Sequence, residues 1–202
     1  MPQLRPSLST AATMGLSIVL LALPASAQTK RGLGAHEHGA GKLDIAFEAG
    51  KVAFELEVPA DDIVGFEHTA KTDKQKAAVE AAKQTLAAGL TLFKLPAGAG
   101  CKLESSKVEL HTEEVEKKPA STENKGHAHG HGHDQVEGGH TEFHAAYAFV
   151  CSAPDKLTEI VFDYFKSFKK AQKLTVTVVS DKGQKQYEVT RKAPRLTLGA
   201  GS

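Results

Sequence analysis

The sequence predicts an α+β domain in which helices cover one face of a largely antiparallel sheet. Three observations predict this class: paired runs of alternating apolar residues, two amphipathic helical segments, and a polar insertion that cannot build a core. The chain has 202 residues, of which 41% are hydrophobic, and this suits one domain with a single core. Its formal net charge of +1 lacks the basic excess that binds phosphate backbones, so no nucleic-acid partner is expected.

The first 27 residues have the features of a secretory signal peptide. Arg5 precedes an apolar run from Ala11 to Leu23, and Ala25-Ser26-Ala27 is the small-residue pattern that signal peptidases cleave. An uncleaved anchor is disfavoured, because spanning a bilayer takes about 20 apolar residues. We therefore expect cleavage after Ala27, a mature domain over 28–202 with no membrane span, and a location outside the cytoplasm.

The first half of the mature chain contains strand signals followed by a helix signal. Residues 42–48 and 51–58 alternate apolar and polar side chains around Ala49-Gly50, which predicts a β-hairpin. Residues 59–68 break the alternation and predict a short helical turn. Thr72 and Gln75 form a capping box before an apolar stripe that ends at Gly89, which predicts the first long helix.

Two cysteines flank the polar insertion. A long strand is predicted from Cys101 to about residue 116, and its parity changes between Leu103 and Val108, so we expect a β-bulge near 105–106. Residues 143–151 alternate as a partner strand that would place Cys151 opposite Cys101. An even cysteine count outside the cytoplasm favours a disulfide, whereas thiolate zinc ligands usually have CxxC spacing.

The C-terminal third predicts one more helix and one more hairpin. Pro154 at a first-turn position and apolar residues from Leu157 to Phe168 predict the second amphipathic helix. Residues 173–180 and 184–190 predict a hairpin, and Pro194 is expected to end the regular structure. A strand leads into a similar turn twice, at 58–61 and 153–155, which would suit an internal duplication.

The insertion, at 117–139, is rich in histidine. It holds four of the ten His, and with His140 and His144 six fall within 18 residues; the composition of the insertion predicts a mobile segment. Neutral imidazole is a ligand for zinc, copper or nickel, although a low-complexity linker with incidental His is the alternative. Because a flexible tract loses entropy on binding, we expect weak, exchangeable metal sites there. They would use His127, His129, His131 and His133.

Tighter sites need ligands on ordered elements, and two places offer an imidazole pair. His36 and His38 precede the first strand with the parity of its outward residues. His140, Glu142 and His144 share one face of the later strand, which would make a zinc half-site, the alternative being ordinary polar strand residues.

Two further histidines are weaker candidates for metal ligands. His68 either supplies a fourth ligand or makes local hydrogen bonds in its turn. His111 lies among acidic residues on a strand, where a solvated structural role is favoured.

The chain resembles a known family at several motifs. These are Ala35-His36-Glu37-His38-Gly39, the string from Pro59 to His68, both cysteines, the His-rich insertion, and His140-Thr141-Glu142-Phe143. They resemble the ZrgA-type periplasmic zinc-binding proteins over about residues 33–198. The insertion departs from many such tracts by being poorer in Asp.

This resemblance implies a periplasmic zinc-binding protein that scavenges or buffers zinc and assists its delivery to an uptake system. Zinc is the implied metal, and the implied partner is a zinc uptake transporter or its binding protein. We expect a monomer that is not an enzyme. Two alternatives are a secreted zinc-dependent hydrolase, for which no HExxH signature is present, and an envelope adaptor whose metal is purely structural.

Overall fold

The structure is a computed structural model that describes residues 37–48, 50–112 and 140–199. The described residues all belong to one compact unit. The predicted signal peptide, His36 and the four histidines of the insertion lie outside the described residues. The mobility of the insertion and the cleavage after Ala27 therefore stay predictions.

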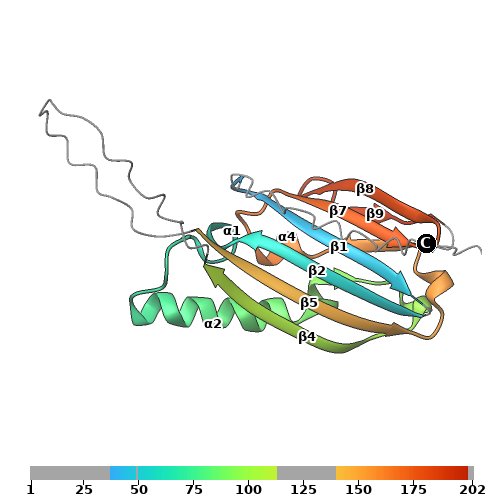
Figure 1. Cartoon of the computed structure of the whole chain (residues 1–202), viewed down its shortest axis with the longest axis horizontal. Coiled ribbons are helices and arrows are strands. Elements are labelled where there is room, and N and C mark those ends of the chain that lie inside the picture. Colours follow the sequence, from blue (N-terminus) through green and yellow to red (C-terminus); the bar gives the residue numbers. More distant parts are fainter. Residues whose placement is uncertain (1–36, 49, 113–139, 200–202) are drawn as a thin grey trace, which may run out of the picture. The chain divides into compact units, whose positions relative to one another are not determined.

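The larger of two sheets has six strands in the order β4-β5-β2-β1-β7-β8 (Figure 1). All neighbouring strands are antiparallel except β1 and β7, which are parallel. Both predicted hairpins are confirmed. The strands are β1 (Ala40–Glu48), β2 (Lys51–Pro59), β4 (Cys101–Thr112), β5 (Thr141–Cys151), β7 (Lys173–Ser180) and β8 (Gly183–Thr190).

A smaller sheet and four helices complete the described fold, which confirms the α+β class. The smaller sheet has the order β3-β6-β9, with β3 at Phe93–Lys94, β6 at Glu159–Phe162 and β9 at Arg195–Thr197. The helices are α1 (Ala60–Val64), α2 (Asp73–Ala87), α3 (Gly89–Leu92) and α4 (Tyr164–Ser167), with 3-10 turns at Ala97–Ala99 and Pro154–Lys156. None of the described helices is long and apolar enough to cross a membrane.

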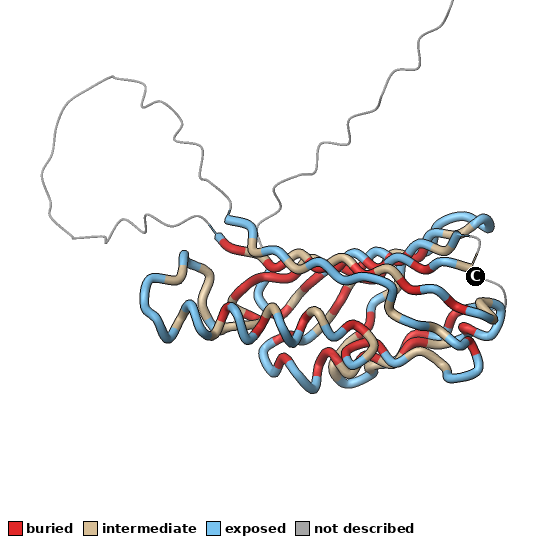
Figure 2. The backbone as a smooth tube through the Cα atoms, turned by 90° about the horizontal axis from the view of Figure 1, so that it is seen from below, coloured by how far each residue is buried: buried red, intermediate tan, exposed pale blue. Residues whose placement is uncertain are grey.

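The core lies between the inward face of the larger sheet and the elements packed against it. Along β1, β2, β5 and β7, buried residues alternate with less buried ones, as a half-buried sheet requires. Figure 2 shows the buried segments gathered between these layers. Phe93 of β3 is central, because its ring meets those of Phe54 and Phe162 edge to face at 5.3 and 5.7 Å.

Helix α2 has the cap that the sequence predicts. The Thr72 hydroxyl accepts from the Gln75 amide, and the Gln75 side chain accepts from the Thr72 amide in return. At its other end, the Tyr147 hydroxyl donates to the Leu86 carbonyl at 2.7 Å. Gly89 then approaches the Tyr147 ring so closely that a Cβ would lie 2.7 Å from it, so only glycine fits.

The predicted disulfide and bulge are both confirmed. Cys101 pairs directly with Cys151 in the β4–β5 ladder, and the two form a disulfide. The ladder shifts register between Leu103 and Ser105, one residue before the predicted place.

The predicted second amphipathic helix is wrong. Residues 159–162 form β6 instead, in which Ile160 and Phe162 are buried while the strand pairs with β3 and β9. A single helical turn, α4, follows. Ladder partners from distant segments overrode the helical spacing of the apolar residues. Pro194 does not end the regular structure either, since β9 follows it.

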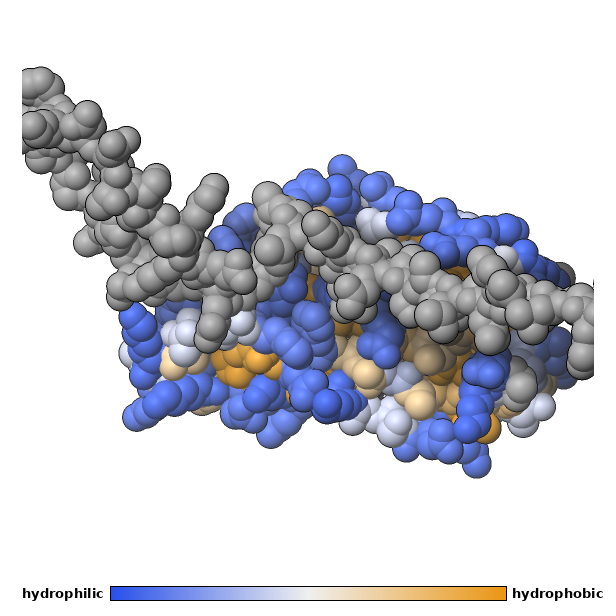
Figure 3. Space-filling view, in the orientation of Figure 1, coloured by the Kyte–Doolittle hydropathy of each residue, from blue (hydrophilic) through white to orange (hydrophobic). Residues whose placement is uncertain are grey.

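The outward face of the larger sheet is mostly hydrophilic where Figure 3 leaves it visible, with smaller hydrophobic areas between. The repeated turns at 58–61 and 153–155 lead into α1 and into a 3-10 turn, respectively. The internal duplication stays a prediction.

Candidate metal centre

Histidines and carboxylates meet in two groups near the start of β5. The first, the loop group, consists of His38, Asp61, Glu67 and His140. The second, the sheet group, consists of Glu109, His111, Glu142 and His144. The two groups share no residue.

Glu67 is the centre of the loop group. Its Oε2 lies 2.7 Å from Nδ1 of His140, and its Oε1 lies 3.4 Å from Nδ1 of His38. The first contact is a hydrogen bond, whereas the buried Oε1 has none despite its nearby ring nitrogen. Two imidazoles, one just before β1 and one just before β5, thus converge on one largely buried carboxylate.

Asp61 is the second carboxylate of the loop group. Its Oδ2 lies 3.5 Å from Nδ1 of His38, and its Oδ1 and Oδ2 both accept from the Lys170 ammonium, at 2.8 and 3.1 Å. The Lys170 hydrogen bond is the main reason that the pKa of Asp61 is lowered, so this side chain stays ionised at neutral pH. Asp61 therefore offers the His38 side of the group a negative charge.

The turn that carries His38 is fixed by its neighbours. The amide of Gly39 donates to Oδ1 of Asp62 at 2.8 Å, and Gly39 itself has a φ of +82°, which favours glycine. Asp62 is buried, and this burial raises its pKa. A buried carboxylate that accepts from this amide ties the His38 turn to α1.

The backbone of Glu67 is held by the first residue of β5. The buried Thr141 donates to the Glu67 carbonyl through both its amide, at 3.0 Å, and its hydroxyl, at 2.8 Å. This double contact places Glu67 beside His140, which directly precedes Thr141.

A loop before β7 closes the other side of the group. It brings Lys170 to Asp61, and the amide of Gln172 donates to the Gly39 carbonyl. Arg191 holds this loop through donation to the carbonyls of Phe165, Phe168 and Ala171.

The sheet group lies on the outward face of β4 and β5. The rings of His111 and His144 stack with centroids 4.2 Å apart. Nε2 of His144 lies 3.3 Å from Oε2 of Glu142, and Nε2 of His111 lies 3.7 Å from Oε2 of Glu109. Each imidazole thus has a carboxylate beside it on the same strand.

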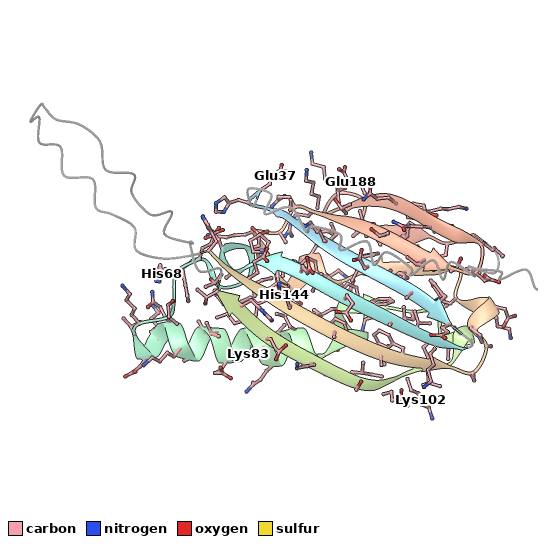
Figure 4. The ribbon with its side chains drawn as sticks, viewed as in Figure 1. Glu37, His68, Lys83, Lys102, His144 and Glu188 are labelled. Atoms are coloured by element: carbon pink, nitrogen blue, oxygen red, sulfur yellow. A yellow bond between two sulfur atoms is a disulfide. The ribbon has the colours of Figure 1, made fainter. Side chains whose placement is uncertain are left out.

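His68 makes local contacts instead. Its ring stacks on Phe66, and its Nδ1 lies 3.0 Å from the Thr69 carbonyl. Its Nε2 lies 3.4 Å from the side-chain Nε2 of Gln75, so the ring lies beside the first turn of α2. Figure 4 shows His68 away from His144. These contacts match the structural alternative for His68.

The atom spacings of both groups can be compared with those around zinc. In tetrahedral zinc, bonds of roughly 2.0 to 2.2 Å place neighbouring ligand atoms about 3.3 Å apart. The contacts of His38 with Glu67 and Asp61, at 3.4 and 3.5 Å, are near that value, while the shorter His140–Glu67 hydrogen bond would have to open slightly. Within residues 37–48, 50–112 and 140–199, no three such side chains already have the arrangement of a metal centre.

The sequence anticipates part of this arrangement. The predicted trio divides, because His140 contacts Glu67 while Glu142 contacts His144. The strand parity assumed for His38 is wrong, because β1 begins only at Ala40 and the chain turns at His38 and Gly39.

Three carboxylates and one imidazole of the two groups were not among the predicted ligands. Glu67 is next to His68 in the sequence, and Asp61 belongs to the same string, so the motif itself was the available signal for these two. Glu109 was regarded only as part of an acidic strand face. His111 was assigned a structural role, and its contact with His144 follows only from the β4–β5 register.

Comparison with known proteins places these groups in context. No curated protein matches the chain. A family model does match it, over residues 35–198, and this span contains every residue of both groups. The chain therefore belongs to the family described as ZrgA family zinc uptake protein.

Proposed function

We propose that this protein is a periplasmic zinc-binding protein that captures zinc at the loop group and passes it to an uptake system. The observation that carries the proposal is the Glu67 carboxylate, which lies between two imidazoles with its buried Oε1 lacking a hydrogen bond. An unsatisfied buried oxygen has lost its hydration without compensation, and a bound cation would supply that compensation.

The donor set suits zinc. Imidazole nitrogen and carboxylate oxygen are both zinc ligands, and the loop group offers two of each, which is a tetrahedral number. Copper binds such donors more tightly in general, so affinity alone does not select zinc. Membership of a zinc uptake family supports zinc as the metal.

The exposure of the rings supports capture and release. The side chains of His38 and His140 are 63% and 59% exposed, whereas that of Glu67 is 16% exposed. Zinc can therefore reach the imidazoles from solvent and leave again without unfolding of the chain. A purely structural metal would be enclosed, so this arrangement supports transport over the adaptor alternative.

We propose a role without catalysis. Four protein ligands would fill the tetrahedral coordination of zinc and leave no position for an activated water, which hydrolytic zinc requires. The family description also names uptake and no reaction. Hydrolysis of ester or phosphoester substrates by the zinc-loaded chain, lost in Glu67→Gln, would contradict this part of the proposal.

The proposed periplasmic location is supported by one sequence feature and one structural feature. One is the signal-like segment 1–27, and the other is the Cys101–Cys151 disulfide, which needs an oxidising compartment. The His-rich tract joins β4 to β5 and enters β5 beside His140, so it would raise the zinc concentration next to the loop group.

Zinc competition with a chelator of known affinity tests the loop group. The tract is silenced in the full chain by alanine substitution of its four histidines, so that its weak sites do not contribute. In this tract-silenced chain, His140→Ala and Glu67→Gln are expected to weaken the affected zinc site at least about 100-fold, since each removes one ligand.

His68→Ala is the matched control, because it removes an imidazole with only local contacts. It should change zinc affinity by less than about twofold. Equal affinities in His140→Ala, Glu67→Gln and the parent would exclude the loop group as a zinc site.

A further inference from the structure

The sheet group is a second convergence of zinc-type donors, built from different residues on different elements. We propose that Glu109, His111, Glu142 and His144 form a second zinc site on the outward face of the larger sheet. The choice of zinc rests on the proposed function, whereas the four ligands are independent of the loop group.

The β4–β5 register brings the four side chains together. Glu109 pairs with His144 and His111 pairs with Glu142, so each directly opposed pair combines an imidazole with a carboxylate. Opposed side chains in a ladder start about 5 Å apart, and diagonal ones lie within reach of a long side chain. The result is a two-by-two block in which the histidines occupy one diagonal and the glutamates the other.

The contacts between these side chains already approach the spacing of zinc ligands. The two imidazole–carboxylate distances are 3.3 and 3.7 Å, against about 3.3 Å between neighbouring ligands of tetrahedral zinc. The stacked rings hold the two Nε2 atoms on one side of the ladder, and rotation about the side-chain bonds would turn both towards one ion. Both strands are paired throughout this region, so the ladder holds the backbone of all four residues in place.

The charge around the block favours a cation. Glu57 of β2 pairs with His144 from the other side, so β5 has a carboxylate on both flanks there. The Lys107 ammonium lies 2.9 Å from Oε1 of Glu109, and the other oxygen, Oε2, is the one that lies beside His111.

His111 and His144 both lie at one end of this face. Further along the same face, Ala146 and Ala148 occupy the outward positions of β5, although a carboxylate, Glu55 of β2, pairs with Ala146. The two imidazoles beside carboxylates therefore distinguish this end from the rest of the face. Their position at the end of β4 and the start of β5 sets the second site beside the entry and exit of the His-rich tract.

Zinc stoichiometry and affinity in the full, tract-silenced chain test the proposal, with zinc chloride as the probe. The parent should bind two zinc ions. His111→Ala and His144→Ala should each weaken one of the two sites at least about tenfold and leave the other unchanged. His68→Ala is again the control and should retain both.

The outcomes separate this proposal from the proposed function. If His111→Ala and His144→Ala leave both affinities unchanged, the second site is wrong, whereas the loop group is judged only by His140→Ala and Glu67→Gln. If those loop variants have no effect while the sheet variants remove a site, the second site stands and the loop group is wrong.

NMR chemical shifts of the imidazole nitrogens test the second site without any substitution in the sheet group. In the full chain with labelled histidine, zinc should move the Nε2 signals of His111 and His144 together. Movement of other imidazoles at saturation, with these two unchanged, would overturn the second site.

Discussion

The two ends of the β4–β5 pair differ in what they contribute. At one end, Cys101 and Cys151 face each other and are joined by a disulfide, with Cys151 almost fully buried. At the other end, the outward side chains are imidazoles and carboxylates, which contact one another and remain accessible to solvent. The disulfide stabilises one end of the pair, and the polar end takes its geometry from the β4–β5 ladder beside it.

The bulge between these ends connects the two. Leu103 and Val108 both pack towards the core although they are five positions apart, an odd spacing that would put them on opposite faces of a regular strand, and the register shift permits this. The same shift turns Glu109 and His111 outward, onto the face of His144. The predictions below test this difference between a structural end and a binding end.

The largest effect is expected from removal of the disulfide. Cys101→Ala with Cys151→Ala should lower the free energy of unfolding by about 4 kcal/mol, since the bond closes a loop of 50 residues. Urea unfolding measures this loss, and zinc affinity of the folded protein should change less than about threefold. A fall in zinc affinity as large as that of His140→Ala would show that the two ends are not separate.

Asp62→Ala should lower the free energy of unfolding by about 2 kcal/mol, because the buried amide of Gly39 loses its acceptor. Asp62→Asn keeps an acceptor. Burial raises the pKa of Asp62, so its ionised form reduces stability above that pKa, and the neutral amide avoids this cost. At pH 7 the melting temperature of Asp62→Asn should therefore equal or exceed that of the wild type, and that of Asp62→Ala should be the lowest. An equal loss of stability in Asp62→Asn and Asp62→Ala would exclude the hydrogen bond as the cause.

The smallest effect is expected for Thr141→Val, which preserves shape and removes one hydroxyl donor to the Glu67 carbonyl. Stability should fall by about 1 kcal/mol, and zinc affinity at the loop group should fall several-fold as Glu67 is less well placed. Thr158→Val, at an exposed position outside both groups, controls for the change of side chain. Unchanged zinc affinity in Thr141→Val would mean that the amide contact alone places Glu67.

Local patterns predicted much of the fold. The capping box at Thr72, the two hairpins and the bulge follow from signals within a few residues, and the structure confirms them. The cysteine pairing followed from their compartment and strand phase. The failure at 159–162 has the opposite cause, because that segment is a strand only by virtue of β3 and β9.

The candidate site was less predictable for a related reason. Spacing along β5 associated His140 with Glu142 and His144, but contacts from the 60–68 segment and from β4 separate them into two groups. Glu67 and His111 gain their partners through tertiary packing and strand register. Neither is encoded within a short window of sequence.

The parallel pairing of β1 with β7 has a consequence for the order of assembly. The two hairpins, β1–β2 and β7–β8, can form from nearby segments, but β1 must wait for β7, and such long-range closure makes folding slow. The Gly39 carbonyl accepts from Gln172 and Lys173 at the start of this junction, and Lys170 reaches Asp61 beside it. The loop group therefore acquires its full geometry only when the sheet closes, so metal loading is expected to follow folding and not to guide it.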